Sequence, residues 1–170
     1  RELPTKGGYL FAWMMDALMV GIGVGFDTLG AGTVTIKEPQ YSNETYIVPD
    51  SREGWVNSVR ILLDGFFLGK KIPNFDYSLI RPPGSLIKGF GGTASGHGPL
   101  EELHNGLKEL YEARIGETIT SVDIVDTENL IGRCVVAGNV RRSAALALGQ
   151  HDDREYLTMK NDQEKLYSHR

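Results

Sequence analysis

The residues in this sequence best suited to chemistry are two adjacent arginines, Arg141 and Arg142, which follow Gly138 and Asn139. Glycine and asparagine tolerate a positive φ and allow other groups to approach the backbone closely. Two neighbouring guanidinium groups can bind a phosphate or carboxylate through paired, charge-assisted hydrogen bonds. The stretch therefore predicts an anion-binding loop, and the alternative is a surface turn with solvated arginines.

A second candidate surface is a strand in which glycine occupies every second position from Gly21 to Gly25. Alternate residues of a strand share one face, so this face would be bare backbone that a flat or bulky group can approach. A dinucleotide-binding turn is excluded because Phe26 and Thr28 stand where its third glycine is required. Tight packing of the strand under a helix is the alternative.

A third glycine-rich stretch, residues 81–96, carries Arg81 and Lys88 as flanking cations. It is not a phosphate-binding Walker loop, because Phe90 occupies the lysine position and Gly91 the serine or threonine position. The two cations can bind phosphate or remain solvated. Three glycine-rich segments that each adjoin a cation favour a site for a polyanionic small molecule, such as a nucleoside phosphate. They do not identify a reaction.

Other catalytic sets are not assembled in the sequence. There is no Gly-x-Ser-x-Gly motif, and the four histidines, at positions 97, 104, 151 and 169, lack zinc-ligand spacing. His151, Asp152 and Asp153 are more typical of a solvated helix start than of a metal site. Cys134 is a candidate nucleophile or redox thiol, but a lone cysteine in an apolar strand is usually buried.

Composition limits the possible partners. The chain has 170 residues, which suits one domain or a piece of a larger one, and it starts at Arg1, which favours a fragment. Its net charge of -4, with scattered lysines and arginines, argues against binding to nucleic-acid polymers. A single cysteine indicates a reduced, cytoplasmic setting. Neither a signal peptide nor a membrane anchor is expected.

Periodicity and capping residues predict the elements that position these candidates. Helices are expected at residues 9–20, from Asp50 or Ser51 to about Gly69, at 99–114 and from Asp152 onward. Trp13 and the nearby methionines are interpreted as core residues, and His104 as a surface or edge residue.

Extended structure is expected between these helices. Residues 33–49 suggest a hairpin or an irregular excursion, and a short strand is expected to end at Arg81. Residues 119–126 suggest a strand or the entry to a short helix. Residues 132–136 and 144–148 are interpreted as strands.

Five motifs in this order resemble the monomeric adenosylcobalamin-dependent ribonucleoside-triphosphate reductases; they lie at residues 24–32, 48–55, 75–82, 89–96 and 135–144. The resemblance covers nearly the whole chain. It implies an α/β fold, part of the ten-stranded α/β barrel of the reductase, with an inserted helical and hairpin region at the effector site. The implied divisions are a barrel helix and glycine-rich strand (1–33), the insertion (34–74) and a barrel segment (75–170) with loop one (81–92) and loop two (132–143).

The resemblance also implies roles for individual residues. The implied substrate-binding residues are Gly23, Gly25, Gly138, Asn139 and Arg141. The implied effector-binding residues are Arg81, Ile87, Lys88 and Arg142, and loop two would link the identity of the effector to the choice of substrate base.

The implied chemistry is reduction of a ribonucleoside triphosphate by a cysteine thiyl radical, which forms after homolysis of the cobalt–carbon bond of adenosylcobalamin. The implied partners are the ribonucleoside triphosphate, a deoxyribonucleoside triphosphate effector and a dithiol or thioredoxin-type reductant, in a monomeric parent enzyme. No catalytic residue or metal ligand is expected in this chain, the cofactor would bind mainly outside it, and Cys134 matches none of the family's reactive cysteines. The segment alone is therefore expected to be inactive. The alternatives are a non-catalytic nucleotide-binding module and an unrelated glycine-rich α/β domain.

Overall fold

The computed structural model describes residues 2–87, 92–138 and 143–161. The helices in these ranges are α1 (Leu3–Lys6), α2 (Tyr9–Met19), α3 (Arg52–Leu68), α4 (Gly98–Glu112), α5 (Ser121–Ala137) and α6 (Arg154–Thr158). The strands are β1 (Val24–Asp27), β2 (Gln40–Ile47), β3 (Lys71–Asp76) and β4 (Ala145–Leu148). The mixture of helices and parallel strands confirms the expected α/β class.

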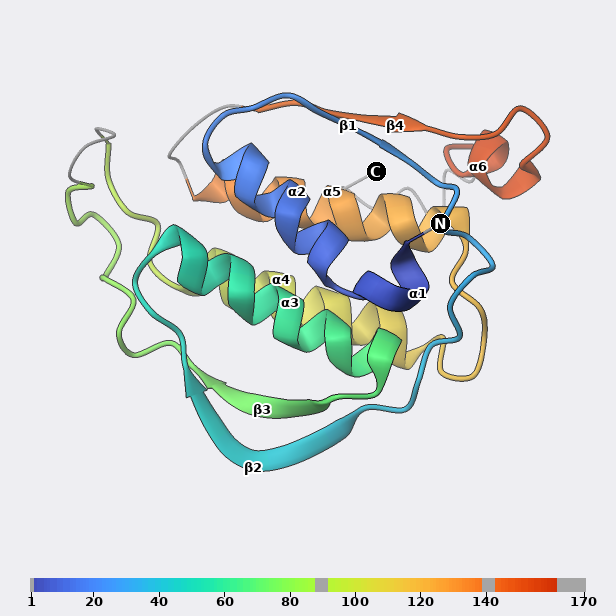
Figure 1. The fold of residues 1–170 in the computed structure, drawn as a ribbon. Helices are drawn as coiled ribbons and strands as arrows, with labels where there is room; N and C mark the ends of the chain where they lie inside the picture. Colours follow the sequence, from blue (N-terminus) through green and yellow to red (C-terminus); the bar gives the residue numbers. More distant parts are fainter. Residues whose placement is uncertain (1, 88–91, 139–142, 162–170) are drawn as a thin grey trace.

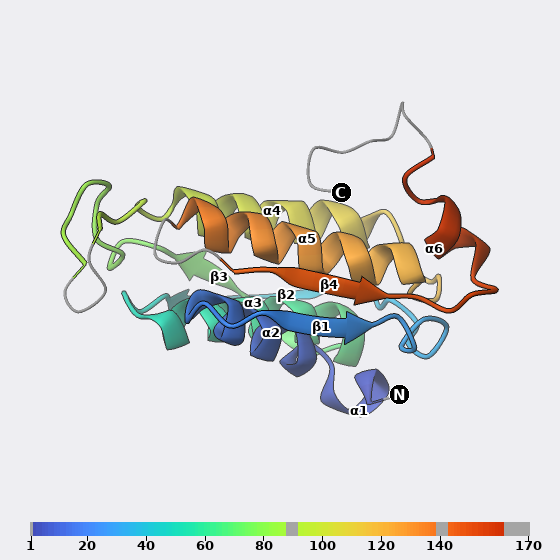
Figure 2. The same ribbon diagram turned by 90° about the horizontal axis from the view of Figure 1, so that it is seen from above.

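The four long helices lie between two small sheets (Figure 1). In that view β1 and β4 lie above α2 and α5, while α3 and α4 lie below these helices and β2 and β3 form the lowest layer. Viewed from above, β1 and β4 run side by side along the helices (Figure 2). No helix in the described ranges is long and apolar enough to span a bilayer.

Both sheets are parallel pairs. Val24 to Asp27 of β1 pair in register with Ala145 to Leu148 of β4. β2 pairs with β3, with an irregularity between Tyr41 and Thr45. Residues 33–49 were expected to form a hairpin or an irregular excursion. The hairpin is wrong, because this range contains one named strand, β2, which follows an irregular stretch at residues 33–39 and pairs in parallel with β3 after the crossover through α3. The expected strand ending at Arg81 also ends earlier, at Asp76.

Local capping explains where the helices begin and end. The side chain of Ser51 accepts a hydrogen bond from the Gly54 amide at the start of α3, and Gly69 follows its last turn with a left-handed φ of 74°. Thr120 and Asp123 form a reciprocal capping box at the start of α5. α5 then continues to Ala137, so the strand predicted at residues 132–136 is wrong.

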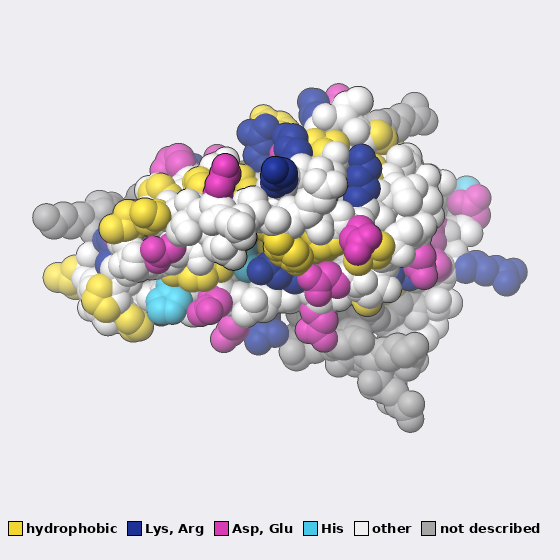
Figure 3. All heavy atoms as spheres, turned by 90° about the horizontal axis from the view of Figure 1, so that it is seen from below, with side chains coloured by type: hydrophobic (Ala, Val, Ile, Leu, Met, Phe, Trp, Pro, Cys, Tyr) yellow, Lys and Arg dark blue, Asp and Glu magenta, His cyan; other side chains and the backbone are white. Residues whose placement is uncertain are grey.

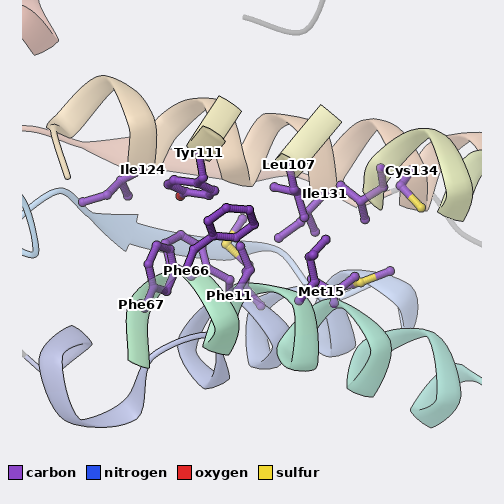
Figure 4. Close-up of a cluster of buried hydrophobic side chains, with 14 of the residues drawn as sticks. Phe11, Met15, Phe66, Phe67, Leu107, Tyr111, Ile124, Ile131 and Cys134 are labelled. Atoms are coloured by element: carbon purple, nitrogen blue, oxygen red, sulfur yellow. The ribbon is translucent and has the colours of Figure 1, made fainter. Parts of the chain in front are cut away.

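Aromatic and aliphatic side chains from all four long helices fill the space between the helix layers (Figure 4). The ring of Tyr111 lies 5.7 Å from that of Phe66 and 5.0 Å from that of Phe67, centroid to centroid. Met14 and Met15 are buried as predicted, but Trp13 is 55% exposed, so its assignment to the core was wrong. Trp13 lies on the outer side of α2, because neighbouring positions on a helix face different directions.

The outer face of the β2–β3 layer is polar and accessible. Most residues of β2 are exposed, β3 contains the buried Ile72 among exposed and half-buried residues, and charged side chains of both signs are interspersed over the face seen from below (Figure 3). This mixed pattern agrees with the absence of a basic stripe in the sequence.

Candidate functional site

A cavity of about 750 Å³ lies at one end of the helix layers, where α2 and α5 end and α3 begins. Five parts of the chain line it: the last turns of α2, the start of α3, residues 80–81, the paired segments at 86–87 and 94–96, and the end of α5. Segments far apart in the sequence therefore enclose one space, as is typical of a ligand site.

Much of the cavity wall is apolar. Met15 and Met19 of α2, Trp55 of α3 and Val135 of α5 line it, together with Ile80. Met15 is fully buried, and Ile80 and Val135 are buried as well. This wall can accept an apolar or aromatic part of a ligand without leaving polar groups unsatisfied.

Two arginines also line the cavity, and each is held by carboxylates. The Nε of Arg81 donates to Asp50 at 2.7 Å, and its Nη1 donates to the carbonyl of Leu86 at 3.4 Å. The Nη1 of Arg52 lies 3.0 Å from Oδ1 of Asp16, and its Nη2 lies 2.8 Å from Oε1 of Glu53. Because these side chains are about one-third exposed or more, the pairs add little stability but orient the guanidinium groups.

The start of α3 adds a further positive element to this wall. The first backbone N–H groups of a helix carry a partial positive charge that favours anions. The hydrogen bonds that Glu53 accepts from its own backbone N–H and from Arg52 lower the pKa of its carboxyl group. Positive and negative groups of the protein therefore lie together at the start of α3, next to the apolar wall.

A short hairpin brings Ile87 to the cavity. The Ile87 amide donates to Gly92 at 3.1 Å and the Ala94 amide donates to Ser85 at 2.7 Å, so residues 84–87 pair with residues 92–94. Gly84 permits the turn into this hairpin with a φ of 86°. The hairpin contains most of the stretch predicted as loop one.

Three of the residues predicted to bind nucleotides lie together on this cavity: Arg81, Ile87 and Gly138. Gly138 was assigned to the substrate, yet it shares the cavity with the two effector residues. Lys88, Asn139, Arg141 and Arg142 lie outside the described residues, so their roles stay predictions.

Gly23 and Gly25, the other predicted substrate residues, lie next to β4 and do not line the cavity. A Cβ atom added at Gly23 would have its nearest contact 3.9 Å away, at the Ala144 carbonyl, and one at Gly25 would meet the Leu146 carbonyl at 4.0 Å. The bare backbone face is therefore open, and packing under a helix does not explain these glycines. Their substrate role stays a prediction.

His104 is fully buried, so its interpretation as a surface or edge residue was wrong. Its Nε2 lies 3.0 Å from Ser58 Oγ and its Nδ1 lies 2.6 Å from the Tyr77 hydroxyl. Since Ser58 Oγ already donates to the Trp55 carbonyl, we assign the ring proton to Nε2, and Tyr77 then donates to Nδ1. Burial lowers the pKa of His104 to about 3, so the ring is neutral.

Cys134 is buried near the cavity, in α5 rather than in a strand. Burial raises the pKa of its thiol to about 12, with a smaller contribution from Glu102. Since the thiolate is the reactive form, the structure agrees with the expectation that Cys134 is structural.

A second cavity of about 890 Å³ lies among α4, α5 and α6. It is lined by several carboxylates, including Glu102 and Asp123, and by Arg114 and Arg133. The Nη2 of Arg114 lies 3.4 Å from Oδ2 of Asp123, and its Nη1 lies 3.0 Å from Oε2 of Glu117. The guanidinium group therefore already forms ion pairs with two carboxylates. None of the predicted nucleotide-binding residues that the structure describes lines this cavity.

Sequence reasoning missed Arg52, Trp55 and Met19 as cavity residues. Arg52 was interpreted as part of a helix start and of the motif at residues 48–55, and Met19 was interpreted as one of the core methionines. The sequence does contain one indication of their shared role. Arg52 and Trp55 are three positions apart, and this spacing places both side chains on the same side of α3. Nothing local indicated which side would face a cavity.

Comparisons with known proteins agree with the resemblance. A family model described as the insertion domain of B12-dependent ribonucleotide reductase matches residues 27–111. The chain is 48% identical to a probable adenosylcobalamin-dependent ribonucleoside-triphosphate reductase of Dictyostelium discoideum, over 96% of this chain and 23% of that protein. It is 46% identical to the corresponding Euglena gracilis enzyme, over 94% of this chain and 22% of that protein.

A solved structure of a B12-dependent (class II) ribonucleotide reductase matches the fold with a TM-score of 0.79 and 34% sequence identity. The match covers 94% of this chain and 27% of that one. The chain thus spans about a quarter of the length of the relatives it matches. The likeness supports the expected α/β barrel segment.

Proposed function

The chain belongs to the B12-dependent ribonucleotide reductase family, and from this we propose that it is a segment of an enzyme that reduces ribonucleoside triphosphates to deoxyribonucleoside triphosphates. In this proposal the segment recognises nucleotides and contributes no reacting group. The cavity binds the deoxyribonucleoside triphosphate effector, and the open face of β1, with Gly23 and Gly25, lies beside the substrate ribose.

One observation carries the effector proposal: Arg81 and Ile87 of loop one and Gly138 of loop two lie on the same cavity. Loop two is then the link between the two nucleotides, because its first part contacts the effector cavity and Asn139 and Arg141 follow directly in the sequence. We assign Lys88 and Arg142 to the effector phosphates and Asn139 and Arg141 to the substrate.

The relatives are named as adenosylcobalamin-dependent, and we propose the same cofactor for the whole enzyme. When bound, it supplies the radical that starts the reaction. In the part of the chain that the structure describes, no group of three or more metal-ligating side chains is assembled. From the family resemblance we propose that the cofactor binds mainly outside this chain. We further propose a dithiol or thioredoxin-type reductant, a monomeric enzyme and a cytoplasmic location.

The effector proposal is tested by calorimetric titration of the full-length protein with deoxyribonucleoside triphosphates. Replacing Arg81 with Ala removes a charge-assisted contact, and we expect at least about tenfold weaker binding. Arg60→Ala is the matched control, since Arg60 lies on α3 and does not line the cavity. Equal affinity in Arg81→Ala and the wild type would refute the assignment, and binding without turnover of any ribonucleotide would favour a non-catalytic nucleotide-binding module.

A further inference from the structure

We propose that the base of the effector lies against the indole of Trp55 in the cavity, while its phosphates face Arg52 and Arg81. This inference rests on the proposed function and gives the ligand an orientation within the site. It also assigns roles to Trp55 and Arg52, which belong to the motif at residues 48–55 but received no role from it.

The lining of the cavity combines the two kinds of group that a nucleotide needs. It contains apolar side chains, among them Met15, Met19 and Val135, and the guanidinium groups of Arg52 and Arg81. A nucleoside triphosphate likewise joins a flat, weakly polar base to a polyanion. Phosphates placed against apolar side chains would be charged groups without partners, which is strongly unfavourable. A base against Trp55 with phosphates at the two arginines gives each part of the ligand a suitable partner.

Trp55 is the aromatic residue among the described side chains that line the cavity. It is half-buried, and it packs against the hydrophobic core. The carbonyl of Trp55 accepts the hydrogen bond from Ser58 Oγ, which joins this turn of α3 to the buried His104. The indole thus belongs to a firmly held turn, and a fixed aromatic ring is a good platform for stacking a base.

The phosphate end retains unused donors. An arginine has five N–H groups, and the contacts described above use two of them in Arg81 and two in Arg52. The carboxylates therefore orient both guanidinium groups and leave N–H groups for a phosphate. Arg52 and Trp55 are three positions apart on α3, so one helix side presents the cation and the indole to the same ligand.

The methionines that line the cavity with Trp55 indicate that this site contributes affinity rather than base selection. Met15 and Met19 are unbranched and flexible, and such side chains adapt to groups of different shape. Stacking is also tolerant of base identity, because every base has a π face. Trp55 should therefore strengthen the binding of all four deoxyribonucleoside triphosphates, while selection among bases is made by loop two.

The test is calorimetric titration of the full-length protein and its Trp55→Leu variant with each of the four deoxyribonucleoside triphosphates and with inorganic tripolyphosphate. We expect Trp55→Leu to bind each nucleotide about tenfold more weakly, with losses that agree within about threefold, and to bind tripolyphosphate like the wild type. Trp55→Phe should recover most of the affinity. Trp13→Leu is the matched control, because Trp13 is exposed on α2 away from the cavity.

The outcomes separate this inference from the proposed function. Unchanged nucleotide binding in Trp55→Leu, or an equal loss for tripolyphosphate, overturns the orientation and leaves the effector site standing. A wild-type protein that binds no deoxyribonucleoside triphosphate overturns the effector site itself. If Trp55→Leu does not fold, Trp55→Phe and Trp55→Met provide the same comparison between nucleotide and tripolyphosphate.

Discussion

The cavity at the end of the helices and the open face of β1 differ in how complete they are within this chain. Five segments enclose the cavity, and its cations are already oriented by carboxylates. Beside Gly25, by contrast, the sheet face carries Leu146 and Leu148, which are 62% and 56% exposed.

The difference shows which of the two surfaces is lined on several sides by residues of this chain. A two-stranded sheet is marginally stable by itself, and parallel sheets are usually covered on both faces. In the proposed function, the β1–β4 pair forms one side of the substrate site, and other parts of the enzyme cover it. The cavity, by contrast, has walls on several sides within one segment, so its residues can be tested more directly.

The largest expected effect is on the support of the cavity wall. His104→Ala removes a buried ring and leaves Ser58 Oγ and the Tyr77 hydroxyl without their partner. Because Ile80 follows Tyr77 by three residues and its amide donates to the Tyr77 carbonyl at 3.0 Å, the loss should reach the cavity. We expect the free energy of unfolding to fall by about 3 kcal/mol, measured by urea denaturation.

The control for this substitution is His151→Ala, which alters an exposed turn residue and should change the free energy of unfolding by less than about 0.5 kcal/mol. A loss in His104→Ala as small as that of the control would show that the buried network does not support the wall.

The second effect concerns the sheet face. Gly25→Val adds a side chain whose Cβ atom would meet only the Leu146 carbonyl, at an ordinary contact distance of 4.0 Å, so the stability of the protein should not fall, but the ribose could no longer approach the backbone. We expect turnover by the full-length enzyme to fall by about a hundredfold, the loss typical of a misplaced substrate. Effector affinity should stay the same, since Gly25 does not line the cavity.

Turnover and thermal unfolding of Gly25→Val would be compared with those of Gly98→Ala, which adds a Cβ atom to open space. Full activity in Gly25→Val would show that the substrate does not bind at this face. The cavity would then be the one remaining proposed nucleotide site.

The third effect, which is small near neutral pH, is a decrease in the free energy of unfolding on acidification. The pKa of His104 is about 3 in the folded protein, against an ordinary value of 6.5. The unfolded chain therefore binds the proton more readily between these values, and stability is full above about pH 6.5 and declines as the pH falls toward 3. The slope from this group is at most about 1.4 kcal/mol per pH unit.

Urea denaturation at several pH values would measure this slope in the wild type and in His104→Gln, which retains a polar side chain but does not titrate. The variant should lose less stability on acidification than the wild type does. Parallel curves for the two proteins would exclude His104 as the source of the acid sensitivity.

Local signals in the sequence were sufficient for several elements. The apolar periodicity of residues 9–20 and 99–114 predicted α2 and α4, and Ser51 marked the start of α3. These features depend on neighbours within one or two turns, so they can be read from the chain itself. The order of the glycine-rich motifs also indicated the family before the fold was known.

The error at α5 shows a limit of such signals. Cys134, Val135 and Val136 form a short apolar run that periodicity alone cannot assign, and β-branched residues favour a strand locally. The spacing of Thr120 and Asp123 was the available sign of a helix start, because a threonine and an acidic residue three positions later form a capping box.

The sequence by itself determined the helices with strong periodicity, the α/β class and the membership of the reductase family. Only the tertiary structure decided that His104 is buried, that Trp13 is exposed, and that Arg81, Ile87 and Gly138 share one cavity with Trp55. The physical reason is that burial and the approach of distant segments depend on how helices pack on one another. That packing is set by contacts between residues far apart in the chain, which no local spacing records.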